Sequence, residues 1–207
     1  MPGTMIQADL VSDLKASLQD AADVFSAAND ADFKRHLDLS ALDFTRHRPR
    51  TILATITLIA DQDIYAAPAD CMVYKSTLWG TNRTQPWERT WPGKLPLAKV
   101  IQGVAGRELH LIPPPTANQI IILGAPYRFY YFARHIIDPA IAANTSIQAG
   151  DRGLLLLRAQ AEAMKEMAIR NIKKPVQMRD GMSSAPRNGT PTALFEILMK
   201  QFEEYAA

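Results

Sequence analysis

The stretch Thr51-Ile52-Leu53-Ala54-Thr55-Ile56-Thr57-Leu58-Ile59-Ala60 is where the pattern of apolar residues changes along this chain of 207 residues. Two sets of side chains alternate along this stretch, and many of them are β-branched, which predicts a strand buried on at least one face. Further extended phrases at residues 64–70 and 109–116 are separated by proline-containing breaks. Residues 51–137 are therefore predicted to form a β region.

Within the β region, the later segments are read as strands and breaks. Residues 107–112 alternate and should form a strand that the Pro113-Pro114-Pro115 corner ends, whereas residues 97–102 fit a short helix or a strand. Residues 119–132 are predicted to be the longest strand, with a bulge or bend at Gly124-Ala125-Pro126. Residues 81–96 have no clean period and are interpreted as a long ordered loop.

Both ends of the chain instead have the period of amphipathic helices. One apolar stripe runs from Ile6 to Phe25 and predicts a first helix. Asn29 or Asp30 is expected to cap a second helix, which ends before Pro49 because the residue preceding proline avoids the α region. Asp151 is expected to cap a long helix that runs to about Lys174.

The C-terminal segment allows two interpretations. Residues 175–190 have the composition of a linker, and Thr190-Pro191 can start a last helix because proline in the first turn loses no hydrogen bond. That helix is either a core element of the monomer or an arm that docks in a partner's groove. In the second case its apolar anchors are Leu194, Phe195, Leu198, Phe202 and Tyr205.

These patterns predict an α+β fold, a helical bundle of about four helices with an inserted antiparallel β-sheet or small β-sandwich. The predicted parts are an N-terminal helix pair (1–50), the β region (51–137) with its long loop (81–96), a helical region that completes the bundle (138–174), the linker (175–190) and the C-terminal helix or arm (191–207).

Catalytic, metal and cofactor motifs are not found in the sequence, so we expect no enzyme and no cofactor. The four histidines lie on different elements without a metal-ligand spacing, and His36 is expected to be solvated on a charged helix face. Glu162 and Glu166 are likewise assigned to a solvated face. Cys71 is the single cysteine and is interpreted as a buried structural thiol. The apolar runs are too short to cross a bilayer, and no signal peptide is recognised.

Charge is unevenly distributed along the chain. Residues 71–135 contain 8 bases and 2 acids, a net charge of +6, whereas the whole chain has a net charge of +2. This asymmetry predicts one basic surface, and the residues assigned to it are Lys75, Arg83, Arg89, Lys94, Lys99 and Arg107. Trp79, Trp87 and Trp91 are interleaved with these bases, and packing or a subunit interface is favoured over stacking on nucleic-acid bases.

Taken in order, these phrases resemble the head-to-tail adaptor (connector) proteins of tailed bacteriophages. The resemblance rests on the helix pair, the Pro68-Ala69-Asp70 strand entrance, the 109–115 phrase, the strand ending at residues 127–135 and the last two helices. It implies a homo-oligomeric ring of twelve copies beneath the portal protein, which extends the channel for the packaged DNA without reading its sequence and docks a tail or neck protein. It further implies a virion neck location after folding in the host cytoplasm.

The resemblance assigns the C-terminal helix to portal binding, and we interpret Trp87 and Trp91 as a loop that docks on the tail or neck. The alternative hypothesis is a sequence-independent DNA-binding module that uses the basic segment 71–135. A hydrolase is a third hypothesis, and it would need acids and a histidine that converge in one pocket.

Overall fold

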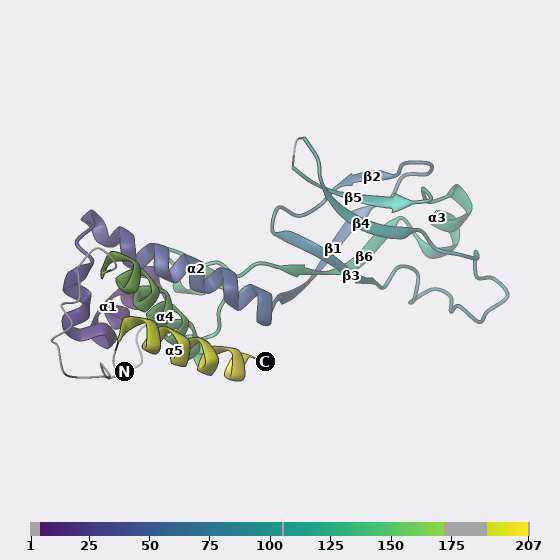
Figure 1. Ribbon diagram of the computed structural model, residues 1–207. Coiled ribbons are helices and arrows are strands. Elements are labelled where there is room, and N and C mark those ends of the chain that lie inside the picture. The colour runs from purple at the N-terminus through teal and green to yellow at the C-terminus, as the bar shows by residue number, and fades with distance from the viewer. Residues whose placement is uncertain (1–4, 105, 172–189, 207) are drawn as a thin grey trace, which may run out of the picture. The chain divides into compact units, whose positions relative to one another are not determined.

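The structure, a computed structural model, describes residues 5–104, 106–171 and 190–206. It is α+β, as predicted, with five α-helices and two three-stranded antiparallel sheets within those ranges (Figure 1). The chain divides into a helical unit, Met1–Arg48 with His135–Ala207, and a β unit, Pro49–Arg134. The boundaries lie within three residues of the predicted limits of the β region.

The helical unit combines segments from both ends of the chain. Its α-helices are α1 (Gln7–Leu18), α2 (Ala31–His47), α4 (Arg152–Asn171) and α5 (Pro191–Ala206). Leu10, Leu14, Leu37, Leu155 and Phe202 are completely buried in its core. Burial of such apolar side chains supplies most of the free energy that holds the helices together.

Two details of the first helices differ from the prediction. The first α-helix ends at Leu18, where Gln19 adopts a positive φ of 51°, and a 3-10 helix (Gln19–Val24) follows. Helix α2 begins after Asp30, as predicted, but the Asp30 side chain makes no capping hydrogen bond. The apolar stripe predicted the buried face correctly, since both segments contribute to the same core, but not the break in the helix axis.

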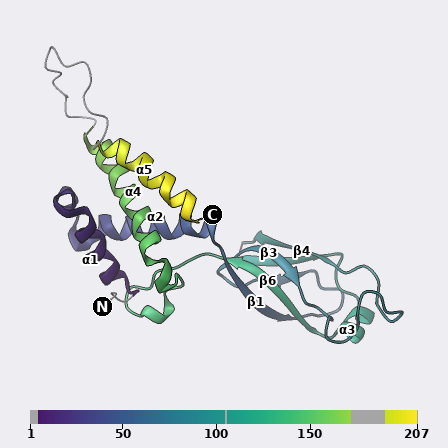
Figure 2. The ribbon, with the colours of Figure 1, turned by 90° about the horizontal axis from the view of Figure 1, so that it is seen from below.

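Helix α5 packs along α4 within the helical unit (Figure 2). Phe202 and Ala206 have no exposed surface, and Phe195 and Leu198 are partly buried against the same core. Arg48 closes the end of the helix: its Nε donates to the carbonyl oxygen of Ala206 at 3.1 Å, and its Nη2 donates to that of Tyr205 at 2.7 Å. A cation at a helix C-terminus also interacts favourably with the helix dipole.

The β unit contains two sheets. One has the strand order β1 (Arg50–Thr57), β6 (Pro126–Ala133) and β3 (Cys71–Thr77). The other has the order β2 (Ile64–Ala66), β5 (Arg107–Ile112) and β4 (Leu97–Gln102), so the segment 97–102 is a strand. Inward-facing residues of both sheets form one apolar cluster, in which Leu109, Leu111, Phe129 and Cys71 have no exposed surface. Cys71 is a buried thiol, as predicted.

The predicted long strand over residues 119–132 is wrong in its first half. Residues Ala117–Leu123 form helix α3, and strand β6 begins only at Pro126. A capping box starts the helix: the Gln119 amide donates to Thr116 Oγ1 at 3.2 Å, and the Gln119 side chain accepts from the Thr116 amide at 3.0 Å. These two bonds satisfy backbone donors in the first turn of the helix. The run of isoleucines alone resembles a strand, so the prediction missed the helix.

The long loop after β3 is anchored by Trp79, which is 1% exposed and donates from Nε1 to the carbonyl oxygen of Gly124 at 2.7 Å. Further along, Thr84 is buried, and its hydroxyl lies 2.8 Å from Glu88 Oε2 and 3.0 Å from the hydroxyl of Thr90. Polar side chains, the buried Trp79 indole and a few partly buried apolar residues, such as Trp91, therefore order this segment, which explains why it lacks an apolar period.

Replacing Phe202 by alanine should lower the free energy of unfolding by about 3–5 kcal/mol, because the substitution leaves a cavity in the core of the helical unit. Replacing Tyr205, which is 60% exposed on the same helix, by alanine should change the free energy of unfolding by about 0.5 kcal/mol or less. Urea denaturation followed by circular dichroism measures both values. Equal effects of the two substitutions would show that α5 is an arm and not a core element.

Candidate functional site

Helix α5 has a second apolar face besides the one that packs on α4. Leu194, Ile197 and Tyr205 recur at helical spacing and are 37%, 50% and 60% exposed. We call these three residues the outer stripe of α5. Its inner neighbours on the helix, Phe195 and Leu198, are partly buried against the core.

A mainly apolar groove of about 370 Å³ lies beside the outer stripe. Leu194 belongs to both features, because it also lines the groove. Helices α1, α4 and α5 and the start of the 3-10 helix supply the walls. The lining residues are Ser17, Leu18, Ala21, Gln160, Met164, Met167, Pro191, Leu194 and Leu198. Two methionines give this wall side chains that can adapt their shape to an apolar partner.

The structure divides the five predicted anchors of the C-terminal helix. Leu194 and Tyr205 are exposed, Phe195 and Leu198 are partly buried, and Phe202 is a core residue of its own chain. The assignment of Phe202 to a partner interface is therefore corrected. Ile197 was missed, although its spacing of three residues from Leu194 places both on one helix face.

The two tryptophans of the predicted docking loop have different surroundings. Trp87 is 81% exposed, whereas Trp91 is partly buried against the core of the β unit. The Trp91 amide donates to the carbonyl oxygen of Glu88 at 3.0 Å, which closes a turn beside Trp87. Trp91 thus holds the loop, and Trp87 is the tryptophan that is free to contact a partner.

The predicted basic residues do not form one surface. Lys75 lies on the outer face of the β1-β6-β3 sheet, with its Nζ 5.0 Å from the centre of the Phe132 ring. Lys99 lies on the outer face of the other sheet, opposite His110. Arg107 donates to the carbonyl oxygen of Met72 at 3.3 Å, and the remaining predicted bases are exposed on the long loop, namely Arg83, Arg89 and Lys94. These bases are separated because they lie on two different sheets and on the loop between them.

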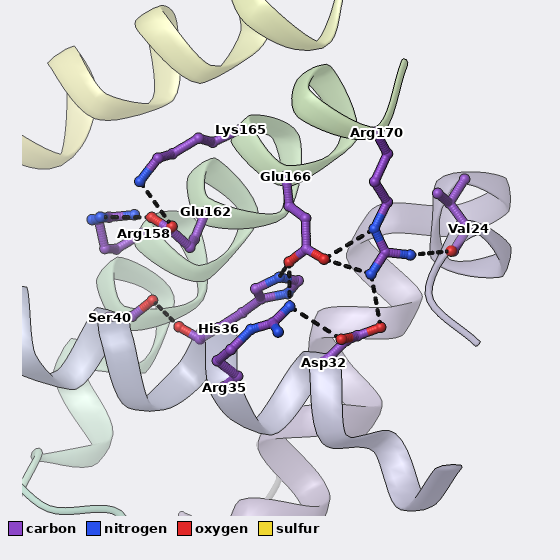
Figure 3. A network of polar contacts seen from close by, with 10 residues as sticks. All are labelled: Val24, Asp32, Arg35, His36, Ser40, Arg158, Glu162, Lys165, Glu166 and Arg170. Atoms are coloured by element: carbon purple, nitrogen blue, oxygen red, sulfur yellow. Dashed lines mark hydrogen bonds and ion pairs between the residues drawn. The ribbon is translucent and has the colours of Figure 1, made fainter. Parts of the chain in front are cut away.

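The helical unit contains a polar cluster that the sequence did not reveal, which we call the Glu166 cluster (Figure 3). The Glu166 carboxylate lies 2.7 Å from His36 Nε2 and 3.0 Å from Arg170 Nε, and it also accepts a hydrogen bond from Arg35. Asp32 accepts from Arg35 and from Arg170, each at 3.1 Å. The cluster therefore joins α2 to α4.

The Glu166 carboxylate is held in its charged form. Burial alone would raise its pKa, but hydrogen bonds from His36, Arg170 and Arg35 outweigh burial and lower the pKa to about 2. The predicted solvated positions of His36 and Glu162 are wrong, since His36 has no exposed surface and Glu162 is 9% exposed. The sequence of one amphipathic helix does not show whether a second helix covers its charged side chains.

A second polar cluster, the Arg158 cluster, joins the same two helices. Arg158 donates from Nε to Asp43 at 2.9 Å and from Nη2 to Glu162 at 3.0 Å, and Lys165 donates to Glu162 at 3.0 Å. Arg158 is only 6% exposed, so these ion pairs are poorly screened by water. The carboxylates of both clusters accept hydrogen bonds from side chains of the same chain. The clusters therefore hold α2 and α4 together.

Comparisons with known proteins add no family assignment. No protein-family model matches the chain, and a search of curated proteins finds no relative. Within residues 5–104, 106–171 and 190–206, no group of three or more histidine, cysteine, aspartate or glutamate residues is arranged to hold a metal ion. None of the helices in those ranges is long and apolar enough to cross a membrane.

The Glu166 cluster predicts a specific pH dependence of stability. Since the pKa of Glu166 is lowered from 4.5 to about 2, its stabilisation is present above pH 4.5 and is lost as the pH falls toward 2. Replacing Glu166 by glutamine should lower the free energy of unfolding at pH 7 by about 1–2 kcal/mol, because water at this partly exposed site screens the ion pairs. The difference from the wild type should shrink as the solution is acidified.

Urea midpoints measured between pH 7 and pH 3 test this expectation. Glu204→Gln on the exposed surface of α5 is the matched control and should leave the midpoints unchanged. Parallel pH curves for the wild type and Glu166→Gln would contradict the assigned role.

Proposed function

We propose that the chain is a structural subunit of the neck of a tailed bacteriophage, a head-to-tail adaptor. In this proposal twelve copies form a ring beneath the portal, extend the DNA channel and dock the tail or a neck protein. The helical unit, as a bundle of about four helices, builds the ring and meets the portal. The β unit, a small sandwich, meets the tail.

The observation that carries this proposal is the pair of exposed apolar surfaces on two different units. The outer stripe of α5 and its groove belong to the helical unit, and Trp87 belongs to the β unit. An adaptor needs one surface for the portal and another for the tail or neck protein, besides the two complementary patches that join it to its neighbours in the ring. The outer stripe and Trp87 are assigned to the first two contacts. Exposed apolar patches mark protein–protein contacts, and tryptophan and tyrosine are enriched among the residues that contribute most to binding.

The order of elements supports the same assignment. A helix pair, an inserted β unit, a long helix and a terminal helix follow one another in the arrangement for which the sequence resembles the adaptor family. The C-terminal helix was expected to dock on the portal as an arm. Because α5 packs on its own chain, only its outer stripe is available to a portal in this conformation.

The alternative, a DNA-binding module that uses the basic segment 71–135, is less well supported by the geometry. Lys75 and Lys99 lie on the outer faces of two different sheets, so one straight duplex cannot contact both through a single face. This alternative would be favoured if the isolated chain bound duplex DNA and its binding constant fell with salt concentration as steeply as several phosphate contacts require.

Replacing Ile197 by lysine should abolish assembly while leaving the fold intact, because a charge in the centre of the outer stripe would be buried in the complex. We expect at least about a hundredfold weaker binding to portal rings of the same phage, from the cost of burying an unpaired charge. Native mass spectrometry of the chain mixed with the portal rings measures the occupancy.

Glu203→Lys is the matched control, because it introduces the same residue at an exposed position on another side of α5. It should bind like the wild type. Equal binding of Ile197→Lys and Glu203→Lys would remove the outer stripe from the interface, and failure of the wild type to bind would count against the adaptor function.

Replacing Trp87 by alanine should weaken attachment of the tail or neck protein by about tenfold or more, as expected for an exposed aromatic anchor. Ring formation on the portal should be unaffected, because the tryptophan lies in the β unit. Sedimentation of reconstituted necks with purified tail protein separates the two steps. Loss of the ring itself would show that Trp87 serves a contact between subunits.

A further inference from the structure

A small hollow of about 100 Å³ in the β unit lies between the long loop and the start of strand β6. Arg83 and Asn82 line it from the loop, and Arg128 lines it from the strand. Two arginines and one asparagine are therefore among the residues that line one hollow. Among the residues that the structure describes, no carboxylate lines the hollow.

The backbone on both sides of the hollow is fixed by hydrogen bonds. On the loop, the amides of Arg83 and Thr84 donate to the carbonyl oxygen of Gly80 at 2.9 and 3.1 Å. On the strand, the carbonyl oxygen of Arg128 accepts from the Leu78 amide at 2.9 Å and from the Thr77 hydroxyl at 2.8 Å. The two arginines therefore project from anchored backbone.

Two glycines make the close approach of these segments feasible. Gly80 has a φ of +74°, and a Cβ atom there would lie 2.3 Å from Leu123 Cδ2. A Cβ atom at Gly124 would lie 3.0 Å from the Arg83 guanidinium carbon, so the Arg83 side chain extends directly over Gly124. The buried Trp79 indole, bonded to the Gly124 carbonyl oxygen, holds the same two segments together.

The charges of Arg83 and Arg128 have no counter-ion in the part of the chain that the structure describes. Neither guanidinium forms a hydrogen bond or an ion pair with those residues, whereas Arg35, Arg158 and Arg170 in the helical unit are bonded to carboxylates. The nearest acid along the loop, Glu88, accepts from the hydroxyl of Thr84. Two like charges are thus held next to one hollow without neutralisation.

We propose that this hollow binds a phosphate group. The hollow, of about 100 Å³, is larger than the space that a single water molecule needs, so it can take one small oxyanion. Guanidinium groups bind phosphate oxygens through paired, charge-assisted hydrogen bonds, and two of them match the charge of a phosphate dianion. The group can come from free phosphate or from the backbone of a nucleic acid.

The site does not depend on the adaptor function, since it needs neither a ring nor a portal. It also differs from a general basic surface, because only Arg83 and Arg128 contribute and Arg89, on the same loop, does not line the hollow. A single site predicts saturable binding of one phosphate per chain.

Titration of the full chain with inorganic phosphate in a calorimeter tests the proposal. The wild type should bind one phosphate, each of Arg83→Gln and Arg128→Gln should weaken binding by about tenfold, and the double variant should abolish it. Arg89→Gln is the matched control and should bind like the wild type. Circular dichroism of each variant checks that the fold is retained, which is expected because both side chains are exposed.

A second arm identifies the source of the phosphate group by titrating a short single-stranded oligonucleotide. Weakened oligonucleotide binding in the double variant, with a salt slope of one or two phosphate contacts, would assign the hollow to a nucleic-acid backbone. Binding of inorganic phosphate alone would assign it to the free ion. Identical behaviour of the double variant and Arg89→Gln toward both probes would overturn the proposal.

Discussion

The helical unit depends on a pair of contacts where the chain leaves it and returns to it. Arg48 is the last residue before the β unit and His135 the first after it, and His135 Nε2 donates to the Arg48 carbonyl oxygen at 2.8 Å. The His135 amide also donates to Thr45 Oγ1 at 2.8 Å. Because the Arg48 guanidinium binds the last carbonyl groups of α5, this junction joins α2, the returning chain and the C-terminal helix.

One chain forms two separate apolar cores. The helical core closes around Leu37, Leu155 and Phe202, which come from the two ends of the sequence, while the β core closes within a single segment. The Glu166 and Arg158 clusters then fix α2 against α4 by ion pairs and not by apolar contacts alone. The outer stripe of α5 belongs to the helical unit and Trp87 to the inserted β unit, so the chain has two separate exposed apolar surfaces, as a subunit with several neighbours requires.

The sequence predicted the fold class, the insertion of the β region and the last helix, because apolar periodicity reports which faces are buried. It failed where a few polar bonds decide the structure. The capping box of Thr116 and Gln119 turns an isoleucine run into helix α3, and the burial of His36 and Glu162 arises only when α4 packs on α2. Of the predicted site residues, Leu194, Tyr205 and Trp87 are exposed, whereas Phe202 is a core residue, since spacing cannot distinguish two adjacent apolar faces of one helix.

We propose that this chain is a ring-forming neck subunit whose outer stripe on α5 contacts the portal. Electron cryomicroscopy of the chain mixed with portal rings of the same phage tests this proposal. The proposal predicts a second ring of twelve subunits on the portal, with Leu194, Ile197 and Tyr205 buried at the interface. Bare portal rings beside monomeric protein, or a ring in which α5 faces only solvent, would contradict it.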